Sequence, residues 1–134
     1  MQQPALVALP ETDDDVVALV DFARERGLRV APQRTGHNAK PLGSLDDVLL
    51  VRTDAMQGVE IDPARRVARV RAGSRWADVL PAASAHGLAA LHGSTPDVSV
   101  AGYVLGVGLS GGTTGARGRA LRHPSPRCSP ASPR

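Results

Sequence analysis

The chain has 134 residues, the length of one small domain, and 42% of them are hydrophobic, so a core can form. Aromatic residues make up only 2%, so that core must be built from Val, Leu and Ala. The sequence has no apolar run long enough to cross a membrane, its N-terminus is not expected to be a secretory signal, and a cytoplasmic location is expected. Its single cysteine excludes an internal disulfide but does not indicate the compartment.

The positive charge is concentrated at the C-terminal end. Residues 1–97 hold all 13 acidic residues and 11 of the 16 basic ones, whereas residues 98–134 hold five arginines and no acid. In residues 111–134, 16 of 24 are Arg, Pro, Gly or Ser, without any periodicity. We therefore expect a domain over residues 1–110, and a basic tail over 111–134 that is disordered or is read out of frame.

The first elements predict a strand, a helix and a strand. Residues 4–10 form a short apolar run, and residues 11–27 are typical of a helix in which Thr12 and Asp15 make a capping box. Residues 28–32 predict the second strand, which gives a β-α-β unit. The apolar stripe of the helix consists of Val16, Leu19, Val20 and Ala23.

The following elements predict a further strand over residues 46–53 and a hairpin around an Asp62-Pro63 turn. A helix is expected over residues 74–87, with Ser74 as N-cap and a kink or an early end at Pro81. Residues 88–91 predict a short strand. The pattern as a whole is that of an α+β fold.

Two patterns that resemble ligand motifs have simpler explanations. Capping and the helix dipole account for the acidic residues 13–15, so no metal site is expected. The stretch GVGLSG over residues 106–111 matches a dinucleotide fingerprint, but a poor helix former follows it and no acidic residue lies beyond Asp97.

Two glycine-containing loops are the strongest candidates for binding. The stretch RTGHN over residues 34–38 follows a predicted strand, so its amides could converge on one point, as the pyrophosphate of a dinucleotide requires. Arg34 either adds positive charge there or is a solvated surface residue. The second loop begins near Gly93 and runs through a glycine-rich segment to residue 110.

Three blocks in order resemble one family. VAPQRTGHNA over 30–39, RVARVRAGSRWADVLPAASAHGLA over 66–89 and GSTPDVSVAGYVLGVGLS over 93–110 are similar to the FAD-binding domain of the vanillyl-alcohol-oxidase superfamily, also called PCMH-type FAD-linked oxidases. The berberine-bridge-enzyme-like members are most similar. The resemblance implies the first subdomain of that domain, a partial start of the second, and oxidation of a small organic substrate by hydride transfer to FAD. No catalytic acid or base can be named.

The resemblance also implies which residues contact FAD. It assigns to the cofactor the following residues: Arg34, Thr35, Gly36, His37, Asn38, Gly93, Ser94, Val98 and Gly102. In covalent members the histidine at the position of His37 is bonded to the flavin, whereas the alternative is a loop histidine that only donates or accepts hydrogen bonds. Thr95 replaces the cysteine that makes a second bond in many members, which excludes double attachment.

Several departures limit what is expected of the chain itself. Ser99 and Val107 stand where the family has glycine, and each places a Cβ near the expected cofactor. Because the pattern is lost after residue 110, we expect residues 1–134 alone to bind FAD poorly or not at all and to lack oxidase activity. The alternative is a non-enzymatic product whose basic tail binds anions or nucleic acid nonspecifically, since the tail offers no aromatic residues for base stacking.

Overall fold

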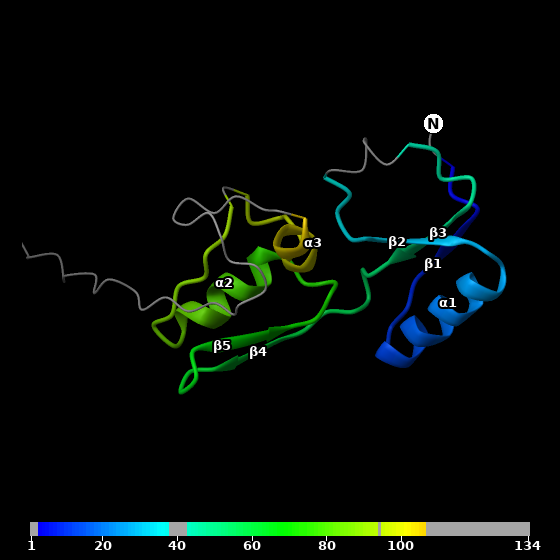
Figure 1. Cartoon of the computed structure of the whole chain (residues 1–134). Helices are drawn as coiled ribbons and strands as arrows, with labels where there is room; N and C mark the ends of the chain where they lie inside the picture. Colours follow the sequence, from blue (N-terminus) through cyan, green and yellow to red (C-terminus); the bar gives the residue numbers. More distant parts are fainter. Residues whose placement is uncertain (1–2, 38–42, 94, 107–134) are drawn as a thin grey trace, which may run out of the picture.

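The computed structural model describes residues 3–37, 43–93 and 95–106, and it shows a mixed fold of strands and helices in two lobes (Figure 1). The elements of the first lobe are β1 (Leu6–Ala8), α1 (Asp13–Glu25), β2 (Arg29–Gln33) and β3 (Val48–Arg52). The elements of the second lobe are β4 (Val59–Asp62), β5 (Val67–Val70), α2 (Trp76–Ser84) and α3 (Val100–Leu105).

The first lobe is a three-stranded parallel sheet with the order β1-β3-β2. The predicted β-α-β unit is confirmed, and β3 lies between its two strands. Helix α1 makes the crossover that parallel strands require. The core between α1 and the sheet contains Ala23, Leu49 and Val51, and the partly buried side chains around it are Ala8, Leu19, Phe22 and Leu28.

Helix α1 begins at the predicted capping box. The Thr12 Oγ1 accepts a hydrogen bond from the Asp15 N–H at 3.1 Å, and the Asp15 carboxylate accepts one from the Thr12 N–H at 2.9 Å. The predicted apolar stripe is wrong at Val20, which is 46% exposed, because Phe22 and not Val20 turns with Leu19 toward the sheet.

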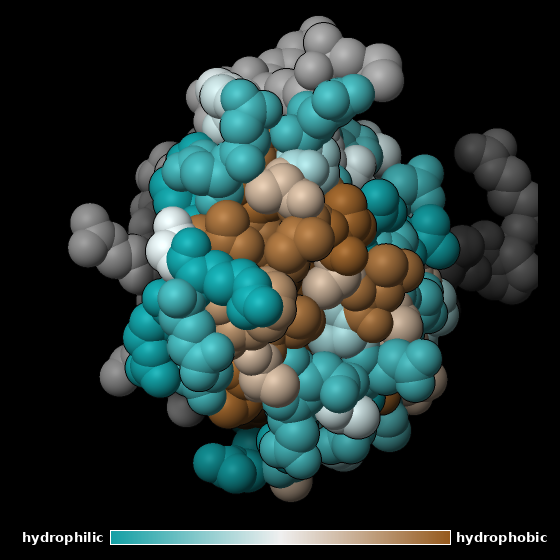
Figure 2. All heavy atoms as spheres, turned by 90° about the vertical axis from the view of Figure 1, so that its right-hand side faces the viewer, coloured by the Kyte–Doolittle hydropathy of each residue, from teal (hydrophilic) through white to brown (hydrophobic). Residues whose placement is uncertain are grey.

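An apolar surface remains open on the first lobe, on the side that Figure 2 faces. The large exposed apolar side chains of the first lobe are Leu6, Val7, Leu9, Val17, Val20 and Val30, and they lie on more than one face, because Leu6 and Val7 are successive residues of β1. Parallel sheets usually have both faces covered by other elements. Among the described residues, α1 alone packs on this sheet as a helix, so the lobe has a thin core.

The second lobe is built on the predicted hairpin, which is confirmed. Strands β4 and β5 pair antiparallel with Ile61 opposite Ala68, and the Asp62 carboxylate accepts a hydrogen bond from the Arg65 N–H in the turn. Trp76 is only 1% exposed and anchors the core that α2 and α3 share. The members of this core are Trp76, Val79, Ala90 and Val100, with Val59, Val70, Leu80, Val98 and Tyr103 packed around them.

The start of α2 differs from the prediction. Arg75 holds the N-cap position, and its N–H donates to the Asp78 carboxylate at 2.7 Å. Ser74 is fully buried instead, and its hydroxyl exchanges two hydrogen bonds with the Gly58 backbone, at 3.0 and 3.1 Å. The helix is therefore shorter than expected, and it ends three residues after Pro81.

The segment after α2 also differs. The predicted strand over residues 88–91 is absent, because the Leu88 N–H donates to the Ala83 carbonyl and closes the end of the helix beyond Gly87, whose φ is +65°. Helix α3 was not predicted, because Gly102 and Gly106 obscure its pattern. The Ser99 hydroxyl caps it by accepting a hydrogen bond from the Gly102 N–H at 3.4 Å.

Candidate functional site

The first candidate loop leaves the end of β2, and two of the residues that the sequence predicted are exposed on it. Thr35 and His37 are exposed, and Gly36 has φ +68°, which an L side chain rarely adopts. A Cβ at Gly36 would also lie 2.6 Å from the Gln33 side-chain nitrogen. This position therefore requires glycine for conformational reasons. Asn38 lies outside the described residues.

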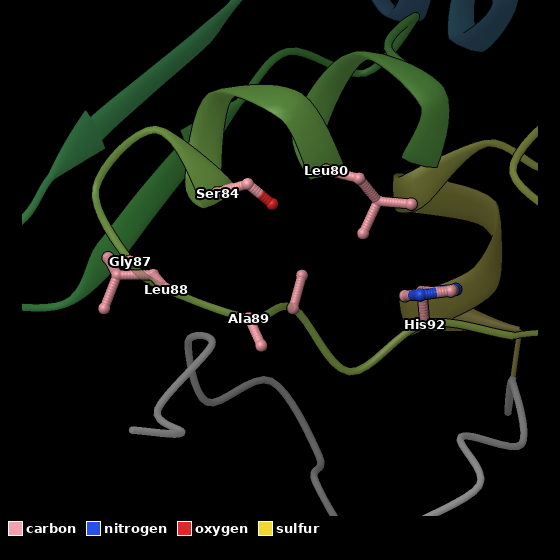
Figure 3. A pocket seen from close by; sticks show the side chains of 7 residues that line it. Leu80, Ser84, Gly87, Leu88, Ala89 and His92 are labelled. Atoms are coloured by element: carbon pink, nitrogen blue, oxygen red, sulfur yellow. The ribbon is translucent and has the colours of Figure 1, made fainter. Parts of the chain in front are cut away.

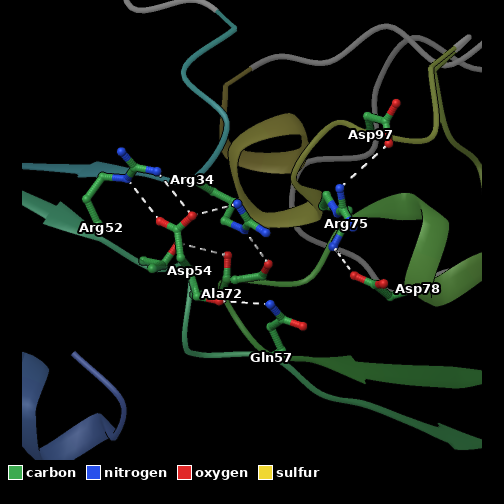
Figure 4. A network of polar contacts seen from close by, with 10 residues as sticks. Arg34, Arg52, Asp54, Gln57, Ala72, Arg75, Asp78 and Asp97 are labelled. Atoms are coloured by element: carbon green, nitrogen blue, oxygen red, sulfur yellow. Dashed lines mark hydrogen bonds and ion pairs between the residues drawn. The ribbon is translucent and has the colours of Figure 1, made fainter. Parts of the chain in front are cut away.

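Arg34 begins this loop and is not a solvated surface residue. Its side chain is 17% exposed, its Nε donates to the Gly73 carbonyl at 2.8 Å, and its Nη1 donates to the Asp54 carboxylate at 2.8 Å (Figure 4). Arg52 also pairs with Asp54, through Nε at 2.9 Å and Nη2 at 3.1 Å. These contacts, that of Arg52 above all, hold the pKa of the Asp54 carboxyl below its usual value.

The second candidate loop is held by its own backbone on the start of α2. The Trp76 N–H donates to the Val98 carbonyl at 3.1 Å, and the Ala77 N–H donates to the Pro96 carbonyl at 2.8 Å. Because these amides are the first ones of α2, loop carbonyls occupy the helix end that could otherwise attract an anion. The Val98 side chain packs on the core around Trp76. Ser94 lies outside the described residues.

Gly93 and Gly102 of the second loop differ in whether packing requires a glycine there. A Cβ at Gly93 would lie 3.0 Å from the Tyr103 ring, so the fold itself favours glycine there. Gly102 is exposed, and a Cβ on it would meet only the Ser99 side chain, at an ordinary 3.8 Å. Glycine inside a helix costs about 1 kcal/mol relative to alanine. The packing of the described chain therefore does not explain Gly102.

Ser99 does not obstruct this surface. It is 4% exposed, and its side chain is turned into the chain as the cap of α3. Its hydroxyl therefore has a capping role, and the expectation that its Cβ lies near the cofactor stays a prediction. Val107 lies outside the described residues.

A short backbone segment brings the two candidate loops to one place. The Gly73 carbonyl accepts the hydrogen bond of Arg34, which starts the first loop, and the next carbonyl, that of Ser74, accepts one from the Val100 N–H at 3.1 Å. We call residues 73 and 74 the junction. Gly73 has no room for a side chain, because a Cβ would lie 2.0 Å from the Thr53 carbonyl oxygen.

A pocket of about 430 Å³ lies beside the second loop, along α2 (Figure 3). It is lined by Leu80, Ser84, Gly87, Leu88, Ala89, Ala90 and His92. His92 lies where the second loop begins. In the structure its ring centroid lies 6.1 Å from that of Trp76, and its Nδ1 contacts the Gly93 carbonyl.

Two polar atoms of the second lobe are buried without a hydrogen-bond partner in the described chain. They are the indole nitrogen of Trp76 and the hydroxyl of Tyr103, whose rings meet edge to face with centroids 5.6 Å apart. Buried polar groups are normally paired. This region of the second lobe is therefore where further polar partners are most strongly required.

Metal binding finds no support in the described ranges. No group of three or more His, Cys, Asp or Glu side chains among the described residues could hold a metal ion. None of the helices that the structure describes has the length and apolarity to cross a membrane.

The sequence profile of a family described as an FAD binding domain matches residues 4–120. This match covers most of the chain. The chain therefore belongs to this family, the FAD-linked oxidases of the vanillyl-alcohol-oxidase and berberine-bridge-enzyme-like type.

Among its relatives, the xylooligosaccharide oxidase of Thermothelomyces thermophilus is 35% identical over 112 residues, which are 80% of this chain and 22% of the relative. The (R)-6-hydroxynicotine oxidase of Paenarthrobacter nicotinovorans is 30% identical over 109 residues, with coverage of 81% and 24%. The chain thus spans less than a quarter of these relatives.

Solved structures confirm the fold. The crystal structure of 6-hydroxy-D-nicotine oxidase from Arthrobacter nicotinovorans superposes with a TM-score of 0.71 at 30% identity, and covers 78% of this chain and 23% of that one. A berberine-bridge-enzyme-like protein of Physcomitrella patens superposes with a TM-score of 0.65 at 28% identity, with coverage of 74% and 22%.

Proposed function

We propose that this chain forms the first part of the FAD site of an oxidoreductase that oxidises a small organic substrate by hydride transfer to FAD. The observation that carries this proposal is the junction, where the Gly73 carbonyl holds the start of the first loop and the Ser74 carbonyl holds the start of α3 in the second segment. Membership of the family supports FAD as the cofactor. The relatives named above are oxidases of small molecules, which supports the substrate class.

The residues of the first loop suit a dinucleotide. The amides of Thr35, Gly36 and His37 would bind its phosphates, since the left-handed conformation of Gly36 turns successive N–H groups outward without a side chain between them. The N-terminus of α2 would not take part, because the second loop covers it. The proposed phosphate contacts are therefore backbone contacts of one loop.

Gly102 would provide a close approach to the cofactor from the second lobe. Its exposed backbone lies in α3, and the described chain gives no packing reason for a glycine there. Absence of a Cβ lets another group contact the backbone directly. When bound, FAD would supply the hydride acceptor, and the chain would supply its orientation.

His37 is the proposed point of covalent attachment. It is exposed in a turn directly after Gly36, so its ring is accessible from solvent. The catalytic base and the substrate pocket are proposed to lie in the part of the relatives that this chain does not span. The domain is proposed to end near residue 110, and the basic tail lies outside the described residues.

A chimera tests the proposed function. The aligned segment of (R)-6-hydroxynicotine oxidase is replaced by this chain, and the purified chimera is examined by visible absorption before and after acid precipitation. We expect flavin at the level of the unmodified host. A folded chimera without flavin would show that these loops do not form an FAD site.

The same chimera tests His37. In His37→Ala we expect loss of the acid-stable colour while dissociable FAD remains, because the loop amides do not depend on the imidazole. The matched control is His86→Ala, since His86 lies in the turn after α2, away from the loop. Acid-stable colour that persists in His37→Ala would refute the attachment at this residue.

A further inference from the structure

We propose that Arg34 is a positioning residue of the flavin site and not a ligand of the cofactor. Its guanidinium joins the first loop to the junction at Gly73 and to Asp54, and so fixes where the loop amides point. This inference rests on the proposed function, because it concerns the same loop, and it assigns to Arg34 a role that differs from a phosphate contact.

The geometry of Arg34 supports a clamp. Its Nε and Nη1 engage two partners at once, each at 2.8 Å, and these partners are 39 and 20 residues away in the sequence. The side chain is 17% exposed, so the contacts are shielded from water. A guanidinium is suited to such a task, because its N–H groups have a rigid, planar arrangement.

The charges around Asp54 support the same role. Its carboxylate accepts hydrogen bonds from Arg34 and from both Nε and Nη2 of Arg52 (Figure 4). Its backbone carbonyl accepts one from the Gln57 side chain. A phosphate that recruited Arg34 would have to compete with a carboxylate already in contact with it.

The two roles predict opposite effects of Asp54→Asn. If Arg34 were a phosphate ligand, removal of the carboxylate charge would release it for the phosphate, and FAD binding would stay the same or become tighter. If Arg34 is a clamp, the same change loosens the loop and weakens FAD binding. Arg34→Lys also distinguishes the two roles. Lysine keeps the positive charge that a phosphate ligand needs, but it lacks the rigid, planar N–H groups that the clamp needs.

Asp47→Asn is a matched control. Asp47 accepts two hydrogen bonds from Arg29, at 2.7 and 2.5 Å, so it forms an ion pair of the same residue types, with side chains that are more exposed, at 59% and 56%. That pair joins the start of β2 to the turn before β3 and makes no contact with residues 34–37 in the described chain. The control variant therefore loses an ion pair without any change at the first loop.

The experiment uses the ¹⁵N-labelled 134-residue chain and its three variants. Backbone order parameters are measured for Thr35, Gly36 and His37, and FAD is then titrated as the probe while amide chemical shifts are followed. We expect order parameters below about 0.6 in Asp54→Asn and Arg34→Lys, as in flexible loops. We also expect about tenfold weaker FAD binding in both, the loss that follows when charge-assisted hydrogen bonds are removed. Asp47→Asn should match the wild type.

The inference is overturned if the order parameters of the loop stay unchanged in both variants, or if Asp54→Asn binds FAD as tightly as the wild type or more tightly. Should Asp54→Asn fail to fold, Arg34→Lys decides by the same criteria. If FAD shifts no loop amide in the wild type, the proposed function fails, and the order parameters alone decide whether Arg34 holds the loop.

Discussion

The two candidate loops are fixed by different forces. The first depends on a charged side chain, since Arg34 connects it to Asp54 and to the Gly73 carbonyl. The second depends on its own backbone, whose carbonyls at residues 96 and 98 accept hydrogen bonds from the first amides of α2. The first loop should therefore respond to charge and pH, and the second to changes in backbone and core packing.

The junction is where both loops depend on two adjacent residues, and the largest effect is expected there. In Gly73→Ala the new Cβ would lie 2.0 Å from the Thr53 carbonyl oxygen and 2.8 Å from that of Met56, so the backbone must move. We expect a loss of more than about 3 kcal/mol in the free energy of unfolding, measured by urea denaturation.

Gly102→Ala is the control for that change, because a Cβ has room there. If Gly73→Ala were no more destabilising than Gly102→Ala, the backbone at the junction would not be as close-packed as described.

Low pH should disturb the first loop before the second. Contacts with Arg52 and Arg34 lower the pKa of Asp54 in the folded chain, so this carboxylate contributes stability above its unfolded pKa of about 4. That contribution is lost as the pH falls through the lower, folded value. As the pH falls below about 4 we expect the amide signals of Thr35 and Gly36 to broaden before those of Val98 and Ser99.

Asp54→Asn should remove the acid response of the first loop, since the titrating carboxyl is gone. If the amide signals of both loops broadened at the same pH in the wild type, the distinction between a charge-dependent and a backbone-dependent loop would be contradicted.

Gly102→Ala should give the smallest effect on stability and should separate folding from binding. Alanine favours a helix by up to about 1 kcal/mol over glycine, so the melting temperature should stay equal or rise slightly. In the chimera the same change should weaken FAD binding, because the Cβ occupies the proposed approach. Unchanged FAD affinity, measured by titration of the apoprotein, would show that Gly102 does not face the cofactor.

Local patterns in the sequence predicted much of this fold. The capping box at Thr12, the turn at Asp62-Pro63 and the need for glycine at Gly36 depend on residues close to one another in the chain, and the structure agrees with each. Such local hydrogen bonds and turns can be predicted from the sequence, because the spacing of the residues identifies which groups interact.

Contacts between distant residues were not predicted. Ser74 was expected to cap α2, but its hydroxyl bonds the backbone of Gly58, 16 residues away. Arg34 was treated as a charge near phosphate or a surface residue, and no pattern in the sequence links it to Gly73 or Asp54. Such pairings depend on how the lobes pack, which spacing does not encode.

The most direct test of the account is a titration of the ¹⁵N-labelled chain with FAD, followed by amide chemical shifts. We predict weak binding, because the chain spans less than a quarter of its relatives, with shift changes in both loops, at residues 35–37 and at Gly93 and Gly102. Changes confined to one loop, changes only around the α2 pocket, or no changes at all would contradict the claim that the junction assembles one FAD site from two loops.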